Sequence, residues 1–279
     1  MNPIKDLRLA VLIDADNIPA HYVKDMLQEI TKYGTPTFKR IYADWTKPAM
    51  TNWKRVLLEN SITPIQQYSY TTGKNSSDSA MIIDAMDILY SGRVDGFCIV
   101  SSDSDFTRLA SRLREAGMKV IGIGERKTLT PMISACDKFI YLEILKSNEE
   151  SVEEKEKDKP SKSRKTIKQP VKAEEPVKQE EALKPEEIKP EETTAKGFAP
   201  VTNPLIRMIS NSINDVADEE GWAFLGDLGN ILLKKQPDFD PRNYGFKKLL
   251  LLIKRIGLFV IDERETGKGN IKHVFVKNK

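Results

Sequence analysis

Hydrophobic residues in the first half of the chain follow two alternating spacings. Short apolar runs rich in β-branched residues predict strands at residues 9–13, 38–43, 63–67, 96–100, 119–123 and 139–142. Amphipathic patterns with helical spacing lie between them, at residues 20–33, 51–60, 77–91, 105–116 and 129–135. This alternation predicts a mostly parallel sheet with helices on both faces, joined by right-handed crossovers.

The apolar pattern is lost across residues 147–197. This segment is rich in Lys, Glu and Pro, as in "EEKEKDKPSKSRK" and "KPEEIKPEE". Such a composition cannot bury enough apolar surface to offset the entropy lost on ordering, so it predicts a disordered, extended linker. A solvated helix or a charged segment that recruits a partner is the alternative.

Helical spacing returns at residues 204–218, 223–235 and 241–256, and two short strands follow at 258–262 and 271–276 around "ETGKGN". Three helices followed by a β-hairpin are typical of a winged helix-turn-helix domain. The core stripe predicted for the third helix consists of Phe246, Leu249, Leu250 and Ile253. We therefore expect a domain at residues 1–146, a linker at 147–197 and a small domain at 198–279.

Composition narrows the class of protein. Of the 279 residues, 39% are hydrophobic and 30% are charged, which fits a chain that folds only in part. The net charge of +3 and the pI of 8.6 permit a nucleic-acid partner. Residues 198–279 are the most basic part for their length, with 13 Lys and Arg against 10 Asp and Glu.

Cysteine usage and the N-terminus bear on the compartment. Cys98 and Cys136 lie in or near apolar stretches and form no CxxC pair, which indicates buried thiols in a reducing compartment. The first residues lack the apolar core of a signal peptide, and the longest strongly apolar run, 249–253, is too short to span a membrane. We expect a soluble cytoplasmic protein with no membrane partner.

Acidic and amide side chains follow two of the predicted strands. The first strand runs into Asp14, Asp16 and Asn17 in "LAVLIDADNIPA", and the fourth runs into Asp103 and Asp105 in "GFCIVSSDSDF". In a parallel sheet, ligands bind beyond the carboxyl ends of the strands. If the first and fourth strands are neighbours, these side chains face one another.

A further acid, Asp78, opens the helix after "TGKNSS", and Asp84 and Asp87 lie inside that helix. Asp78 or Asp105 alone could be a helix-terminal acid, and Asp84 and Asp87 fit a solvated face. Several carboxylates in one crevice repel one another unless they are protonated or neutralised by a cation. Oxygen ligands of this kind suit Mg²⁺ or Mn²⁺, and an ion held there can activate water for attack on phosphorus.

Other catalytic arrangements find no support in the sequence. His21 and His273 are the only histidines, and neither belongs to a recognisable triad or histidine-based ribonuclease pattern. The chain also has no GxxxxGK[ST] phosphate-binding loop. A carboxylate-held metal is therefore the favoured chemistry.

Two stretches resemble the NYN domain, a relative of the PIN-like nucleases: "LAVLIDADNIPA", and the segment from "GKNSSDSAMIIDAMDILY" through "SSDSDFTRLASRLREAGMKVIGIG". The resemblance covers residues 7–145 and implies a Rossmann-like (PIN-like) α/β sandwich with metal-dependent ribonuclease activity. Position by position, it implies catalytic roles for Asp14, Asn17, Asp78, Asp103 and Asp105. The resemblance also implies that the four aspartates of this set, Asp14, Asp78, Asp103 and Asp105, bind the metal. Asp16 would assist them without binding it.

A strand that ends in "DAD" is also similar to the haloacid-dehalogenase-like phosphatases, whose first aspartate is a nucleophile and whose second is the acid/base. That family has Thr or Val two residues after the second aspartate, where this chain has Ile18. No clear lysine motif precedes "SSDSD" either. The phosphatase is therefore the weaker alternative.

The C-terminal segment resembles the OST-HTH domain, also called LOTUS, over residues 204–276, most specifically at "PDFDPRNYGFKKL". The resemblance implies binding of RNA, including structured G-rich RNA, or docking of a helicase-type or other RNA-processing partner. The basic residues predicted to contact RNA are Lys247, Lys254, Arg255, Lys268 and Lys272 here, and Lys74 and Arg108 near the acids. A solvated basic face is the alternative for the C-terminal set.

Two functions remain open at this point. The first is a ribonuclease that hydrolyses RNA phosphodiesters through a Mg²⁺ or Mn²⁺ site, while the C-terminal domain brings RNA near. The second is a non-cleaving RNA-binding adaptor. The complete acid set favours the enzyme, because its repulsion needs a cation. In the first case, tethering of the domains through a linker of about fifty residues would raise the local substrate concentration without a fixed geometry.

Overall fold

The computed structural model describes residues 6–68, 76–145, 198–265 and 272–279. The predicted linker at 147–197, the loop before Asp78 that carries Lys74, and the C-terminal turn that carries Lys268 therefore lie outside the described residues. Among the helices of the described ranges, none combines the length and apolar character that crossing a membrane requires.

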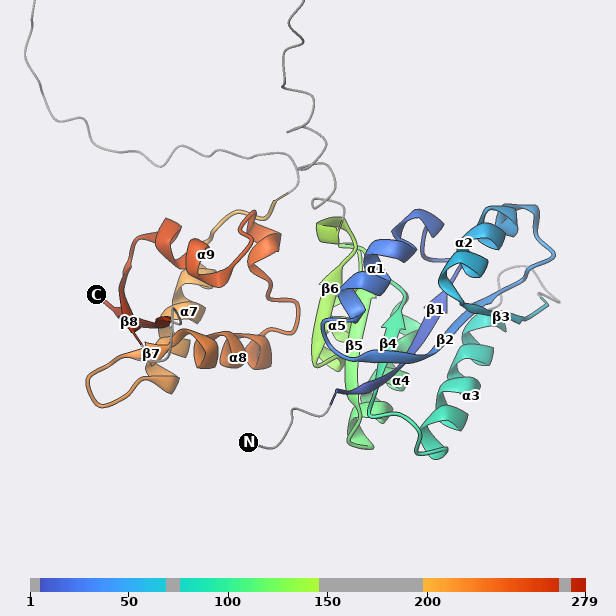
Figure 1. Cartoon of the computed structure of the whole chain (residues 1–279), viewed down its shortest axis with the longest axis horizontal. Coiled ribbons are helices and arrows are strands. Elements are labelled where there is room, and N and C mark those ends of the chain that lie inside the picture. The colour runs from blue at the N-terminus through green and yellow to red at the C-terminus, as the bar shows by residue number, and fades with distance from the viewer. Residues whose placement is uncertain (1–5, 69–75, 146–197, 266–271) are drawn as a thin grey trace, which may run out of the picture.

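A six-stranded sheet forms the centre of the N-terminal domain (Figure 1). Its strands are β1 (Arg8–Asp14), β2 (Thr35–Ala43), β3 (Thr63–Gln66), β4 (Gly96–Val100), β5 (Lys119–Gly124) and β6 (Lys138–Tyr141). They lie in the order β3-β2-β1-β4-β5-β6, and every neighbouring pair is parallel. The predicted parallel α/β sheet is confirmed, and the first and fourth strands are neighbours.

Helices cover both faces of this sheet. They are η1 (Ala20–Tyr22), α1 (Val23–Ile30), η2 (Pro48–Asn52), α2 (Trp53–Asn60), α3 (Ser76–Tyr90), η3 (Ser104–Phe106), α4 (Thr107–Glu115) and α5 (Thr130–Ala135). The α1 and α2 helices pack on one face, and α3, α4 and α5 pack on the other (Figure 1). Cys98 in β4 and Cys136 after α5 are buried free thiols, as the sequence predicts.

The central strand β1 shows why both faces are covered. Successive side chains of a strand point to opposite faces of the sheet. Leu9, Val11 and Ile13 pack in the core that includes α1 and α2, whereas Ala10 and Leu12 pack in the core with α3 and α4. All five are 0% exposed. Since full burial of a large apolar side chain contributes about 1.5–3 kcal/mol, this strand stabilises both helical layers.

The C-terminal domain is a small helical domain with three short strands. Its elements are α7 (Asn203–Val216), β7 (Ala223–Phe224), α8 (Leu225–Lys235), η4 (Pro241–Tyr244), α9 (Leu249–Ile256), β8 (Phe259–Glu265) and β9 (Lys272–Asn278). The strands pair antiparallel in the order β7-β9-β8. Their buried core includes Ile209, Leu228 and Val276.

The third predicted helix of this domain, 241–256, is wrong in extent. The chain turns at Gly245, which adopts φ +84°, and α9 begins only at Leu249. Glycine adopts this left-handed conformation without the steric cost that a Cβ brings. The core positions shift accordingly: Leu252 is fully buried, whereas the predicted core residue Leu250 is only partly buried.

The two domains contact each other directly, in place of the expected tethering without fixed geometry. The backbone N–H of Phe139 in β6 donates to the carbonyl oxygen of Pro237 at 2.9 Å. The Tyr141 hydroxyl donates to Asp238 Oδ2 at 2.7 Å. The segment after α8 therefore continues the hydrogen bonding at the edge strand of the sheet (Figure 1).

Candidate active site

Asp14 ends β1 with a buried carboxylate that is 1% exposed. Its Oδ2 accepts hydrogen bonds from Asn17 Nδ2 at 2.6 Å and from Ser101 Oγ at 2.8 Å, and its Oδ1 accepts one from the Asp16 N–H at 3.1 Å. Burial raises the pKa of Asp14, and the hydrogen bonds from Asn17 and Ser101 oppose that rise. Asn17 therefore orients a neighbouring carboxylate.

Ser101 was not among the predicted site residues, and it links the two strand ends. It follows β4 directly and is 0% exposed. Its hydroxyl donates to Asp14 and accepts from the backbone N–H of Asp103 at 3.0 Å. The only signal for Ser101 in the sequence is its place directly after a buried strand that adjoins β1.

Three carboxylates converge beside this pair of strand ends. Asp103 is the N-cap of η3 and accepts a hydrogen bond from the Asp105 N–H at 2.9 Å. Asp78 lies in the first turn of α3. Oxygen atoms of Asp78, Asp103 and Asp105 lie within 4.8 Å of one another. The structure thus brings three of the four predicted metal-binding acids into one group, with Asp14 as a charged neighbour.

The electrostatics of this cluster call for a counter-charge. Burial, and then the charges of Asp14, Asp103 and Asp105, together raise the pKa of Asp78 to about 6. Three hard oxygen donors that converge at a partly open edge fit a divalent ion that keeps several of its waters. Mg²⁺ and Mn²⁺ both have this preference.

Asp16, the predicted helper, lies at the rim of the site and is exposed. Ser77 Oγ donates to its carboxylate at 3.3 Å, and Lys47 Nζ lies 4.0 Å from it. A hollow of about 460 Å³ adjoins Asp16 and Asn17 and is also lined by Trp53. The hollow therefore opens on the side of Asp16 and Asn17, and the three clustered acids are not part of its lining.

The predicted RNA-contacting residues are more scattered. Lys74 and Lys268 lie outside the described residues. Arg108 is exposed on α4, the helix that follows Asp105. The remaining exposed residues belong to the C-terminal domain and are Lys247, Lys254, Arg255 and Lys272. Of these, Lys254 forms an ion pair with Glu263 at 3.1 Å.

Asp84 does not belong to a solvated face, in contrast to the expectation from its helix pattern. Its carboxylate accepts hydrogen bonds from Arg40 and from the Tyr42 hydroxyl, both on β2. Its side chain is 18% exposed. This ion pair attaches α3 to the sheet, because a carboxylate facing two donors is stabilised at that position.

Comparison with known proteins divides the chain in the same way. Residues 8–143 match the model of the NYN domain, and residues 199–271 match that of the OST-HTH/LOTUS domain. A search of curated proteins gives no match.

Among solved structures, a protein of unknown function from Vibrio parahaemolyticus is 21% identical, with a TM-score of 0.42; the match covers 50% of this chain and 94% of that one. An uncharacterized protein from Nitrosomonas europaea is 33% identical, with a TM-score of 0.27, over 35% of this chain and 91% of that one. A protein from Chromobacterium violaceum is 32% identical, with a TM-score of 0.23, over 28% of this chain and 82% of that one.

Proposed function

Because the chain consists of an NYN domain at residues 8–143 and an OST-HTH/LOTUS domain at residues 199–271, we propose that it is a metal-dependent ribonuclease with an RNA-binding domain. The observation that carries the proposal is the convergence of the Asp78, Asp103 and Asp105 carboxylates within 4.8 Å. RNA is the partner common to both parts, and a helicase-type or other RNA-processing protein is a second proposed partner of the C-terminal domain.

In this proposal Asp78, Asp103 and Asp105 hold a Mg²⁺ or Mn²⁺ ion, and Asp14 adds a fourth negative charge beside them. An ion bound there would supply an activated water and charge stabilisation at the phosphate. Asn17 fixes Asp14 through the 2.6 Å hydrogen bond. The protein thereby holds the reacting groups in a fixed geometry before the substrate arrives.

Ser101 is a positioning residue in the same scheme. Its hydroxyl holds the Asp14 carboxylate and the Asp103 backbone at 2.8 and 3.0 Å, so the ends of β1 and β4 keep one relative placement. The hollow beside Asp16 gives the nucleotide next to the scissile phosphate a place to lie. Cleavage in this scheme needs no histidine or serine nucleophile.

The test is cleavage of end-labelled single-stranded RNA, structured RNA and single-stranded DNA by the purified full-length protein, with Mg²⁺, Mn²⁺ or EDTA. The decisive variant is Asp103→Asn, because asparagine is as good an N-cap as aspartate and leaves the start of η3 intact. Asp87→Asn is the matched control, since Asp87 is exposed on α3 outside the cluster.

We expect metal-dependent RNA cleavage by the wild type and by Asp87→Asn, and none by Asp103→Asn. Equal cleavage by all three proteins would point to a contaminating nuclease and refute the proposed site. RNA binding without cleavage under every metal condition would leave the chain as a non-cleaving RNA-binding adaptor.

A further inference from the structure

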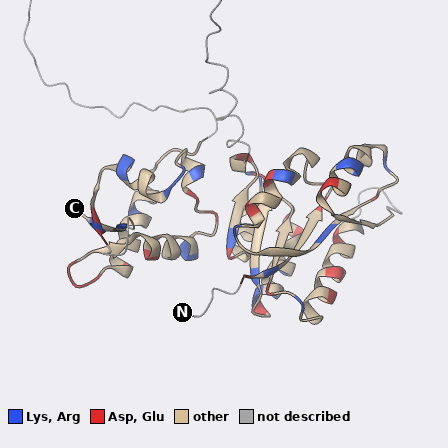
Figure 2. Ribbon diagram, viewed as in Figure 1, with Lys and Arg blue, Asp and Glu red and all other residues tan. Residues whose placement is uncertain are grey.

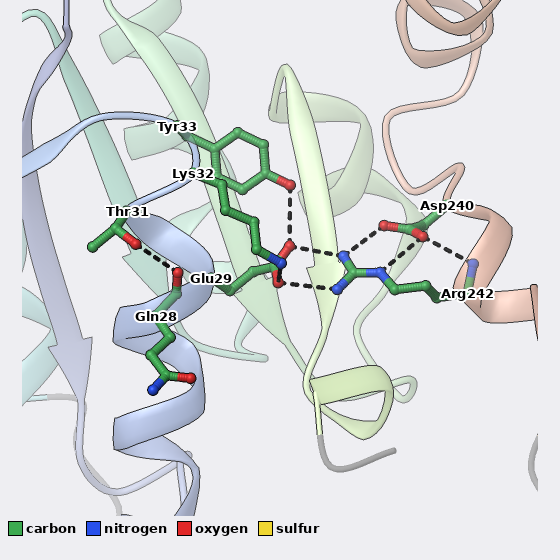
Figure 3. Close-up of polar contacts among 7 residues, drawn as sticks. All are labelled: Gln28, Glu29, Thr31, Lys32, Tyr33, Asp240 and Arg242. Carbon is green, nitrogen blue, oxygen red and sulfur yellow. Dashed lines mark hydrogen bonds and ion pairs between the residues drawn. The ribbon is translucent and has the colours of Figure 1, made fainter. Parts of the chain in front are cut away.

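The two domains are held together by a buried ion-pair clamp, shown in Figure 3. Both guanidinium nitrogens Nη1 and Nη2 of Arg242 in η4 donate to the carboxylate of Glu29 in α1, at 3.0 and 2.8 Å. Asp240 accepts from the same guanidinium at 2.8 Å, while Lys32 and Tyr33 donate to Glu29 at 2.6 and 3.2 Å. Two acids and two cations balance, so the clamp fixes geometry and leaves little net charge.

Beside this clamp lies a cleft of about 980 Å³ with walls from both domains. Six cations line it, and Asp137 is the acid among its lining residues. The cations are Lys32, Arg114, Lys119 and Lys138 from the N-terminal domain and Lys234 and Lys235 from α8. Figure 2 shows Lys and Arg at the end of α8 and along the facing edge of the sheet. Neither domain alone encloses this space.

Ion pairs within the protein neutralise only part of this charge. Lys32 is paired with Glu29 in the clamp, and Lys235 is paired with Asp215. Arg114 and Lys119 share Asp137, at 3.4 and 3.7 Å. The cleft therefore keeps an excess of positive charge when these acids are counted.

Lys138 shows most directly that the cleft suits an anion. It is the first residue of β6, and its ammonium lies 5.5 Å from the centre of the Tyr33 ring. Burial lowers the pKa of Lys138, because the charged form loses hydration there. A phosphate in the cleft would stabilise this ammonium and also that of Lys234 on the opposite wall.

We propose that this cleft binds an RNA strand through its phosphate backbone, at a site separate from the acid cluster. Lys119 and Lys138 begin β5 and β6, whereas the acids lie at the carboxyl ends of β1 and β4. A strand of six residues spans about 20 Å at about 3.3 Å per residue. The cleft therefore lies at the amino ends of the parallel strands, and the acid cluster lies at their carboxyl ends.

A polymeric anion fits the cleft better than a small one, because the cations that line the cleft are spread over several elements of two domains. Lysine is a point charge that contacts phosphates without reading base sequence. The cleft would therefore contribute affinity and direction to RNA that the acid cluster cleaves. The identity of the polymer rests on the function proposed above.

The test is the affinity of full-length protein for a fluorescently labelled single-stranded RNA, measured by anisotropy in EDTA over a range of salt concentrations. EDTA prevents cleavage, so binding is read independently of activity. The cleft variant is Lys138→Gln/Lys234→Gln, with one change on each wall. Lys119→Gln/Lys234→Gln is the second variant, because Lys119 is 48% exposed and its substitution spares the buried position.

The matched control is Lys54→Gln/Arg207→Gln, which removes the same charge from exposed positions, one in each domain, outside the cleft. For single strands, the slope of log affinity against log salt changes by about 0.7 per phosphate contact, so losing two contacts lowers it by about 1.4. Over one decade of salt this predicts that the affinity lost relative to the wild type is about 25-fold larger at 0.1 M than at 1 M salt.

Both cleft variants should show this loss, and the control pair should not. Equal weakening by the control pair, or unchanged affinity in both cleft variants, would overturn the proposal. Failure of the ribonuclease function has a different signature: wild-type protein that binds RNA in EDTA with the expected salt slope but never cleaves it when Mg²⁺ or Mn²⁺ is added.

Discussion

The junction between the domains can be tested by replacing Arg242 with alanine. The substitution removes both hydrogen bonds from the guanidinium to Glu29 while the backbone of η4 stays in place. Glu29 is 4% exposed at its side chain and Arg242 is 17% exposed, so water screens the pair little. We expect the docked arrangement to lose most of its electrostatic stabilisation.

Two lines of reasoning give the magnitude. Removing one partner of a buried ion pair costs about 3–5 kcal/mol, toward the lower end here because Lys32 and Tyr33 still donate to Glu29. Burial alone would raise the pKa of Glu29, but Arg242 and Lys32 outweigh it and lower the pKa from 4.5 to about 2. That difference corresponds to about 3 kcal/mol shared between the two cations. Arg242→Ala should therefore cost about 2–3 kcal/mol, which shifts the docking equilibrium about 30- to 140-fold.

Amide hydrogen exchange at Phe139 measures this shift, because its N–H donates to Pro237 across the junction. In Arg242→Ala the exchange of this amide should accelerate by the same factor, while Ile99 in the central strand β4 keeps its protection. Lys254→Ala is the control, since it breaks an exposed ion pair within the C-terminal domain that contributes about 0–1 kcal/mol. Unchanged protection of Phe139 in Arg242→Ala, or equal acceleration in the control, would refute the role of the clamp.

Two further predictions concern the carboxylates. Asp78→Asn should raise the melting temperature in EDTA at pH 8 by about 2–4 °C, because it removes about 1 kcal/mol of repulsion. Asp78→Asn should also reduce the increase in melting temperature that Mn²⁺ gives. A melting temperature in EDTA below that of Asp87→Asn would contradict the predicted relief of repulsion. Acid should release the junction only at very low pH. The pKa of Glu29 is depressed in the folded protein, so its stabilisation is complete above about pH 4.5 and is lost as pH falls through about 2. Phe139 exchange, corrected for its intrinsic rate, measures this release, and full release already at pH 5 would show that Glu29 is not the group responsible. The groups that face Glu29 are Lys32, Tyr33, Asp240 and Arg242.

Local sequence patterns predict the elements of the N-terminal domain well where an apolar run that marks a buried element is followed directly by polar residues that mark its end. The bounds predicted for β4 equal those observed, because five apolar residues are followed at once by Ser101 and Ser102. The pattern fails at Gly245, where apolar residues on both sides keep helical spacing across a turn. Helical spacing alone does not reveal that a glycine in the left-handed conformation separates η4 from α9.

The parts of the structure that depend on distant partners could not be predicted. Asp103 and Asp105 are predictable because they follow a buried strand, and parallel strands share one carboxyl edge. The pairing of Asp84 depends on donors from β2, more than 40 positions away, so its helix pattern alone suggests solvent. The clamp joins Glu29 to Arg242 over 213 positions, and neither residue has a local signal for it.

Glu29 and Asp78 are both buried carboxylates, and their surroundings act on them in opposite ways. Glu29 faces Arg242 and Lys32, and its pKa falls to about 2 despite burial. Burial and the carboxylates around Asp78 raise its pKa to about 6. The Glu29 carboxylate is neutralised by cations of the protein itself, so it needs no external ion and can join the two domains. Carboxylates that face one another at an open edge of the sheet must take their counter-charge from outside the protein, so this contrast supports an ion-binding role for the acid cluster and a structural role for the clamp.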